Sequence, residues 1–222
     1  MNVLSKEYFE YLKKAYIKID KDRYYERFLL VDIKKGFCIL DIGCGLGFLS
    51  QKIRNMIDDD SPVIGIDVNL YALDYARKIV PSAYFIRASA DKLPFSSEKF
   101  NVVFALDLIE HLKNPVKFLE EVQRVLFDTA SFILCTPDRY TIYLGGKNIL
   151  KHIVSHVMRL LGFRKVDPTH IKEFTIRELS KLLTLNSLVI IRCNGYKTRF
   201  VPFHRMGSII VCCKKRLNVL SA

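Results

Sequence analysis

The 222-residue sequence lacks the features of several classes of protein. No apolar run approaches the roughly 20 residues that a membrane-spanning helix needs, and the first residues do not read as a secretory signal peptide. There is no C-x-x-C pair and no histidine cluster at zinc spacing, so no metal site is predicted. The six cysteines are expected to be thiols in a reducing compartment. We therefore expect a cytoplasmic protein, with peripheral attachment to a membrane left open.

The sequence also lacks internal repeats, low-complexity tracts and any linker rich in proline or glycine. Half of the residues are hydrophobic, which is enough to bury a large core without disulfides or metals. Apolar strands alternate with amphipathic helices, a pattern that indicates a parallel sheet covered on both faces. We therefore predict an α/β protein that forms a single domain over residues 1–222.

The most informative segment present is residues 39–47, Ile-Leu-Asp-Ile-Gly-Cys-Gly-Leu-Gly. An apolar strand runs into three closely spaced glycines, and residues 48–57 continue at helical spacing. Glycines let the backbone turn tightly and let a ligand approach it, while the start of a helix offers unpaired N–H groups. Phe48 stands where the dinucleotide fingerprint G-x-G-x-x-G has its third glycine. The segment therefore favours a nucleotide-like ligand other than NAD.

Acidic residues follow further predicted strands. Asp67 ends the apolar strand 62–67 and lies 20 residues after Gly47. An acid at that place can accept hydrogen bonds from both ribose hydroxyls. Asp91 stands in the loop after the predicted strand 83–88, and a fourth strand, residues 100–105, leads into the segment Leu-Asp-Leu-Ile-Glu-His-Leu.

These four segments, taken in order, resemble the motifs of the class I S-adenosylmethionine-dependent methyltransferases. The resemblance covers most of residues 37–193 and looks most like the small-molecule branch, including the enzymes of quinone and sterol metabolism. It implies a Rossmann-like, doubly wound, mostly parallel seven-stranded sheet with an antiparallel edge strand. The implied cofactor is S-adenosyl-L-methionine, and the implied contacts are Asp41, Gly43, Cys44, Gly45, Gly47, Asp67, Val68, Ala90, Asp91, Leu106 and His111.

The resemblance also divides the domain into four parts. Residues 1–36 would form an N-terminal helical cover, residues 37–137 the cofactor-binding half, residues 138–174 a substrate-covering insertion, and residues 175–222 a C-terminal helix and edge strands. Residues 148–162 of the insertion are amphipathic. That helix is expected either to pack as an ordinary lid or to lie in a membrane interface.

The methyl donor is a sulfonium, so the reaction is a direct displacement that mainly needs alignment and the exclusion of water. A base is needed only for a hydroxyl or a protonated amine acceptor. His170 resembles a family position near the substrate mouth and is the preferred base. Glu110-His111 resembles a pair common in the family; these two and Tyr140 are further candidate bases, although His111 is expected mainly to fix the loop at the cofactor's edge. Tyr140 and Tyr143 could line the pocket.

The net charge of +12 is concentrated in the C-terminal part of the chain. Residues 1–138 hold 19 Lys and Arg against 20 Asp and Glu, whereas residues 139–222 hold 16 against 3. An anionic partner is therefore predicted, and a phosphorylated or carboxylated substrate, an anionic membrane and RNA all stay open.

No Asn/Asp-Pro-Pro-Tyr tetrapeptide follows the fourth strand, which disfavours enzymes that methylate DNA or protein glutamine. We predict a methyltransferase that acts on a small anionic or lipid-like acceptor in preference to nucleic acid. The alternative is a non-catalytic or RNA-associated module that keeps the cofactor-binding fold.

Overall fold

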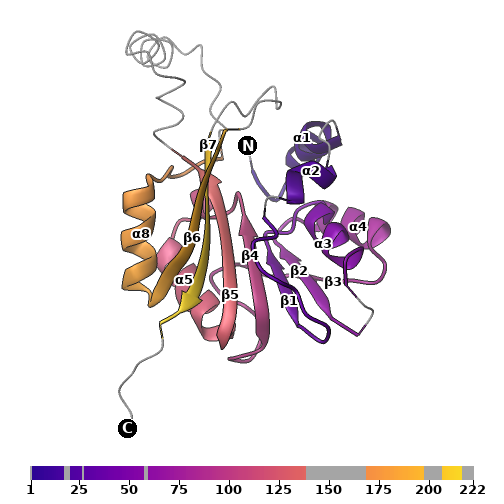
Figure 1. Ribbon diagram of the computed structural model, residues 1–222. Helices are drawn as coiled ribbons and strands as arrows, with labels where there is room; N and C mark the ends of the chain where they lie inside the picture. The colour runs from indigo at the N-terminus through magenta and orange to yellow at the C-terminus, as the bar shows by residue number, and fades with distance from the viewer. Residues whose placement is uncertain are drawn as a thin grey trace, which may run out of the picture.

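A computed structural model describes residues 2–17, 21–26, 28–57, 60–138, 169–197 and 207–216. The rest of the chain is drawn in grey in Figure 1. The predicted lid helix of residues 148–162 and the two candidate pocket tyrosines, Tyr140 and Tyr143, lie outside the described residues. No helix within the described ranges has the length and apolar character needed to cross a membrane.

Seven strands form one sheet in the order β3-β2-β1-β4-β5-β7-β6 (Figure 1). The strands are β1 (Ile39–Ile42), β2 (Val63–Asp67), β3 (Tyr84–Arg87), β4 (Phe100–Leu106), β5 (Leu126–Pro137), β6 (Leu188–Lys197) and β7 (Gly207–Lys215). Strands β1 to β5 pair in parallel, and β7 runs antiparallel to both β5 and β6. The predicted fold class is confirmed, with the antiparallel strand one place inside the edge that β6 forms.

Helices cover both faces of the sheet (Figure 1). They are α1 (Lys6–Ile17), α2 (Lys21–Glu26), α3 (Phe48–Arg54), α4 (Leu70–Ile79), α5 (Pro115–Val125) and α8 (Ile176–Leu185), with a short 3₁₀ turn η1 (Ile109–His111) after β4. Alternate strand residues supply two cores. Leu40 packs with Phe118 of α5 and Leu179 of α8, whereas Ile39 packs with Leu49 of α3.

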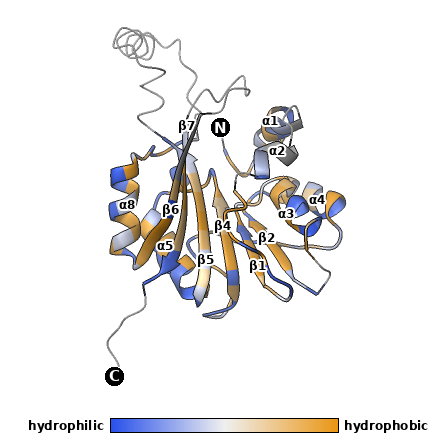
Figure 2. Ribbon diagram, in the orientation of Figure 1, coloured by the Kyte–Doolittle hydropathy of each residue, from blue (hydrophilic) through white to orange (hydrophobic). Residues whose placement is uncertain are grey.

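The central strands β1, β2 and β4 read as nearly continuous hydrophobic segments because both of their faces are buried (Figure 2). Local signals also place the helix starts correctly. The Asn114 side chain accepts a hydrogen bond from Lys117 N at the start of α5, and Thr175 with Glu178 forms the capping box of α8.

Several boundaries differ from those expected. Helix α3 ends at Arg54, three residues before the predicted end at residue 57. The sequence predicts the fifth strand over residues 131–137 and places Leu126 on the apolar face of the preceding helix, but β5 begins at Leu126. Leu126 pairs with Phe100 of β4, so a contact between distant segments determines where the helix stops.

Candidate active site

The turn between β1 and α3 contains three glycines whose φ angles lie in the left-handed region. Gly43, Gly45 and Gly47 have φ angles of 72°, 52° and 78°. The backbone N–H groups of Gly43 and Cys44 donate to the Ile66 carbonyl at 2.8 and 2.9 Å, which fastens the turn to β2. The turn is therefore rigidly placed at the carboxyl edge of the sheet, where ligands of doubly wound folds bind.

Gly45 differs from Gly43 and Gly47 in the space beside its Cα atom. A Cβ at Gly45 would meet no atom within 4 Å, whereas one at Gly43 would lie 3.0 Å from Leu108 and one at Gly47 only 2.7 Å from Ala76. Gly43 and Gly47 are thus required by packing. Gly45 instead presents bare backbone to open space, which is the geometry that lets a ligand approach the chain closely.

Asp67, at the end of β2, borders this open space. Its Oδ2 accepts a hydrogen bond from the Gly45 N–H at 2.9 Å, and its Oδ1 accepts one from the Asn69 N–H at 2.8 Å. Burial raises the pKa of the carboxyl, and the backbone N–H groups of Asn69, Gly45 and Val68 act against that rise. A carboxylate has about four acceptor positions, so the three N–H groups leave at least one for a ligand hydroxyl.

Asp41 lies on the buried side of the turn, next to α3. The residue is 2% exposed, and its Oδ2 accepts a hydrogen bond of 2.7 Å from the Ser50 hydroxyl on α3. Burial raises the pKa of this carboxyl to about 7. These contacts indicate that Asp41 holds the end of β1 against α3 and so sets the shape of the turn.

The loop after β3 is anchored to α5. The Ser89 hydroxyl donates to the Asp91 carboxylate, and Glu121 accepts from the Leu93 N–H at 2.7 Å. Arg124 pairs with Glu121 at 2.7 Å and also donates to the Leu93 carbonyl at 3.2 Å. The Glu121–Arg124 pair therefore positions the loop that carries Asp91, a role that its ordinary helix spacing did not reveal.

The remaining predicted cofactor contacts lie along the same edge. Val68 directly follows β2, and Leu106 is the last residue of β4; both are half-buried. Ala90 is 7% exposed in the loop beside Asp91.

The N-terminal segment is tied to this edge at two points. The Asn69 side-chain amide donates to the carbonyls of Val3 and Ser5 at 2.7 and 3.1 Å. The Tyr24 hydroxyl donates to Asp107 Oδ2 at 3.1 Å, and Asp107 has a φ of 50° just after β4. The two ties lie at the ends of β2 and β4, which flank β1 and its glycine turn. Sequence reasoning did not single out Asn69, Tyr24 or Asp107.

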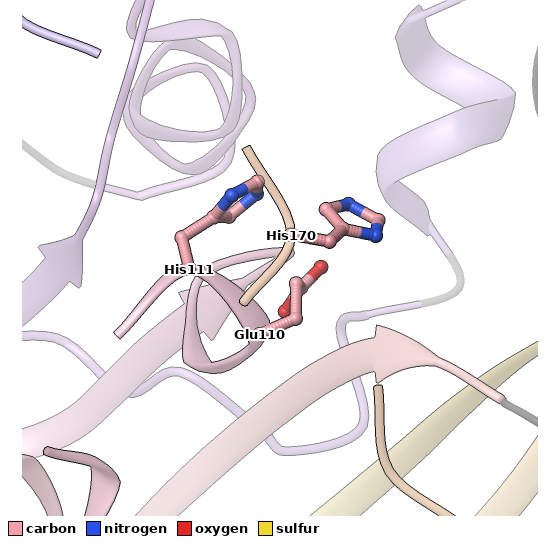
Figure 3. Close-up of side chains that lie close together, drawn as sticks. All are labelled: Glu110, His111 and His170. Carbon is pink, nitrogen blue, oxygen red and sulfur yellow. The ribbon is translucent and has the colours of Figure 1, made fainter. Parts of the chain in front are cut away.

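Glu110, His111 and His170 meet near the end of β4 (Figure 3). Glu110 is fully buried, and its Oε2 accepts from the Thr136 hydroxyl at 3.0 Å. His111 Nδ1 lies 3.1 Å from the Thr169 carbonyl oxygen and 3.0 Å from its hydroxyl. The rings of His111 and His170 stack edge to face with centroids 4.8 Å apart. The fold thus brings together both predicted catalytic histidines with the glutamate beside one of them.

Comparison with known proteins agrees with this geometry. Residues 40–134 match the family described as "Methyltransferase domain". An uncharacterized protein of Methanocaldococcus jannaschii is 32% identical over 164 residues, which are 72% of this chain and 62% of that protein. A protein of Mycobacterium tuberculosis named "Probable S-adenosylmethionine-dependent methyltransferase" is 26% identical over 78% of this chain and 57% of its own length. Residues 40–134 therefore carry a methyltransferase domain, and most of the chain is similar to a probable S-adenosylmethionine-dependent methyltransferase.

Comparison with solved structures supports the fold described above. The crystal structure of a SAM-dependent methyltransferase from Aquifex aeolicus has a TM-score of 0.65 at 17% identity, covering 94% of this chain and 97% of that one. The chain spans less than two thirds of the length of the curated relatives named above.

The residues of this methyltransferase domain fit the cofactor that the family uses. Bare backbone at Gly45 leaves room for a ligand against the turn, and Asp67 keeps at least one acceptor position beside it. The observed turn therefore has both features that a ribose-bearing cofactor requires, space and a fixed carboxylate.

Proposed function

We propose that the protein transfers a methyl group from S-adenosylmethionine to a small acceptor by direct displacement. The observation that carries this proposal is the open space in front of Gly45 with Asp67 fixed beside it. Gly43 and Gly47 meet packed side chains in the same turn, so the opening is specific to the middle glycine.

The cofactor supplies a methyl group on a sulfonium, which needs no further activation. In the proposal, the backbone of residues 43–47 supports the cofactor and Asp67 accepts hydrogen bonds from its ribose. Asp91 takes the adenine side, with its loop held on α5 by Arg124. The N-terminal cover, tied down by Tyr24 and Asn69, excludes water, which leaves alignment as the main source of rate.

The two histidines act at the acceptor end in this proposal. His170 holds the acceptor or takes its proton where the acceptor is a hydroxyl, and His111 fixes the loop between them. The support is placement: both rings lie together, and the Glu110 carbonyl accepts from the Ile171 N–H at 2.8 Å, which fixes the segment that carries His170.

We further propose an anionic or lipid-like acceptor. The basic excess of residues 139–222 supports an anionic one. Two partial relatives support a quinone or sterol type: a cycloartenol-C-24-methyltransferase of Oryza sativa matches 52% of this chain, and a ubiquinone biosynthesis O-methyltransferase of Arabidopsis thaliana matches 47%, each at 28% identity. Attachment to an anionic membrane is part of the same proposal.

Calorimetric titration with S-adenosylmethionine tests the cofactor site, and Gly36 supplies a matched control. Gly36 has a φ of 80° and open space at its Cβ, like Gly45, but lies before β1 at the other end of the strand. Gly45→Val should abolish binding while Gly36→Val binds as the wild type does, because both substitutions impose similar backbone strain. Normal binding by Gly45→Val would show that the cradle lies elsewhere. A wild-type protein that does not bind would leave the non-catalytic alternative.

A further inference from the structure

We propose that Glu110, His111 and His170 form a binding site for a divalent transition-metal cation such as Zn²⁺. One ligand atom from each residue can be chosen so that all three atoms lie within 4.8 Å of one another. Spacing along the sequence predicts no such site, because the two histidines are separated by the whole insertion. The cation site itself is argued from these side chains; its link to the methyl acceptor rests on the proposed function.

The surroundings of His111 leave one ring nitrogen suited to a metal. Its Nδ1 faces the Thr169 carbonyl oxygen at 3.1 Å, and a carbonyl can only accept a hydrogen bond. In the tautomer in which Nδ1 donates to this carbonyl, Nε2 carries no proton and can bind a metal. Metal-binding histidines are commonly held this way, with the second nitrogen donating to a carbonyl.

Glu110 supplies the carboxylate, and its orientation is fixed from two sides. The Thr136 hydroxyl donates to Oε2 at 3.0 Å, and the backbone carbonyl of Glu110 accepts from Ile171 and Lys172 at 2.8 and 3.1 Å. The hydrogen bonds from Ile171 and Lys172 to the Glu110 carbonyl join the segment that carries Glu110 and His111 to the segment that carries His170. In Figure 3 the carboxyl group of Glu110 lies between the backbone that carries Glu110 and the imidazole rings of His111 and His170. A cation would offset the cost of burying this carboxylate.

His170 completes the set. Its Nδ1 is buried and makes no hydrogen bond, and the nearest acid is Glu173, whose Oε1 lies 3.6 Å away. Two imidazoles and one carboxylate favour zinc and neighbouring transition metals over Mg²⁺ or Ca²⁺. Zinc bonds of about 2.0–2.1 Å in tetrahedral geometry place donors roughly 3.4 Å apart. The ligand atoms lie within 4.8 Å of one another, so the side chains must close by at most about 1.4 Å.

Three protein ligands leave a fourth position on the metal for an oxygen atom of the acceptor. A hydroxyl or carboxylate acceptor fits this position, in agreement with the proposed anionic class. A histidine nitrogen bound to a cation has no lone pair for a proton. Metal binding would therefore make His170 a ligand, and the acceptor would be activated by the cation in its place.

The experiment titrates the whole chain with Zn²⁺ by calorimetry and with Co²⁺ by visible absorption. We expect one ion per chain, with affinity reduced about a hundredfold or more in Glu110→Gln and in His170→Gln. Cys193→Ser is the control, because this exposed thiol is a competing zinc ligand, and it should bind as the wild type does. Absence of binding by the wild type, or equal affinity in all four proteins, would overturn the proposal.

S-adenosylmethionine titration of the same samples separates this proposal from the proposed function. Retained cofactor binding by His170→Gln shows that the variant is folded, so its loss of zinc reports on the ligand and not on the fold. A wild-type protein that binds zinc but not the cofactor would refute the proposed function while supporting the cation site. The reverse result would refute the cation site alone.

Discussion

Replacement of Asp41 by Asn tests how strongly the fold disfavours a buried charge under the glycine turn. Asp41 is 2% exposed, and burial raises the pKa of its carboxyl to about 7. Asn has nearly the same shape and keeps an oxygen that can accept the hydrogen bond from Ser50. Asp41→Asn therefore removes the ionisable group and little else.

The sign follows from proton binding. In the unfolded chain the carboxyl loses its proton near its ordinary pKa of 3.8, whereas in the folded protein it keeps the proton up to about pH 7. The folded state thus binds more protons in this window, so the free energy of unfolding of the wild type falls as pH rises from about 4 to 7. The difference between the two pKa values corresponds to about 4 kcal/mol.

Urea unfolding at several pH values measures this effect. From pH 5 to pH 8 the stability of Asp41→Asn relative to the wild type should increase by about 2–3 kcal/mol. Asp32→Asn changes an exposed aspartate and should follow the wild-type profile. Parallel profiles for the wild type and Asp41→Asn would refute the reasoning, because the carboxyl would then ionise as readily in the folded state as in the unfolded one.

Three further results are expected. Arg124→Met should lower the free energy of unfolding in urea by about 1–3 kcal/mol, since it removes hydrogen bonds to Leu93 and its loop. An unchanged midpoint would contradict the anchoring role. Tyr24→Phe, which removes the donor to Asp107, should speed proteolysis of the N-terminal cover, whereas Tyr84→Phe at an exposed site should not. Vesicles with acidic lipid should bind the protein at low salt and release it as salt rises; equal binding to neutral vesicles would rule out charge as the cause.

Much of the fold could be predicted because its signals are local. The central parallel strands β1, β2 and β4 are buried on both faces, so they appear as continuous apolar runs. Asn114 and Thr175 mark helix starts by hydrogen bonds to residues three positions away. The start of β5 was predicted wrongly because Leu126 continues the helical apolar pattern. Its pairing with Phe100 ends the helix there, and that contact has no signal near residue 126.

Part of the candidate site could likewise be predicted from the sequence, and part could not. The three glycines tolerate the left-handed φ angles of the turn and Asp67 ends an apolar strand, so the sequence could indicate both. The ties of the cover could not be predicted, because Tyr24 and Asp107 lie 83 residues apart and either residue alone looks like an ordinary surface side chain. The cofactor contact of Asp41 stays a prediction, and its hydrogen bond to Ser50 adds a role in shaping the turn that the sequence did not indicate.

The proposed acceptor site, formed by Glu110, His111 and His170, shows why the motifs of this family indicate the cofactor more clearly than the substrate. The proposed cofactor edge is built from residues 41–47, 67–69 and 89–91, which lie at or just after the ends of β1, β2 and β3. The acceptor edge instead joins Glu110 and His111 to His170, which reaches them only where the chain returns from the insertion. The meaning of Glu110-His111 therefore depends on a partner that no local pattern specifies, and two proteins with the same motif can differ there. Zinc titration of Glu110→Gln and His170→Gln examines that distant contact directly.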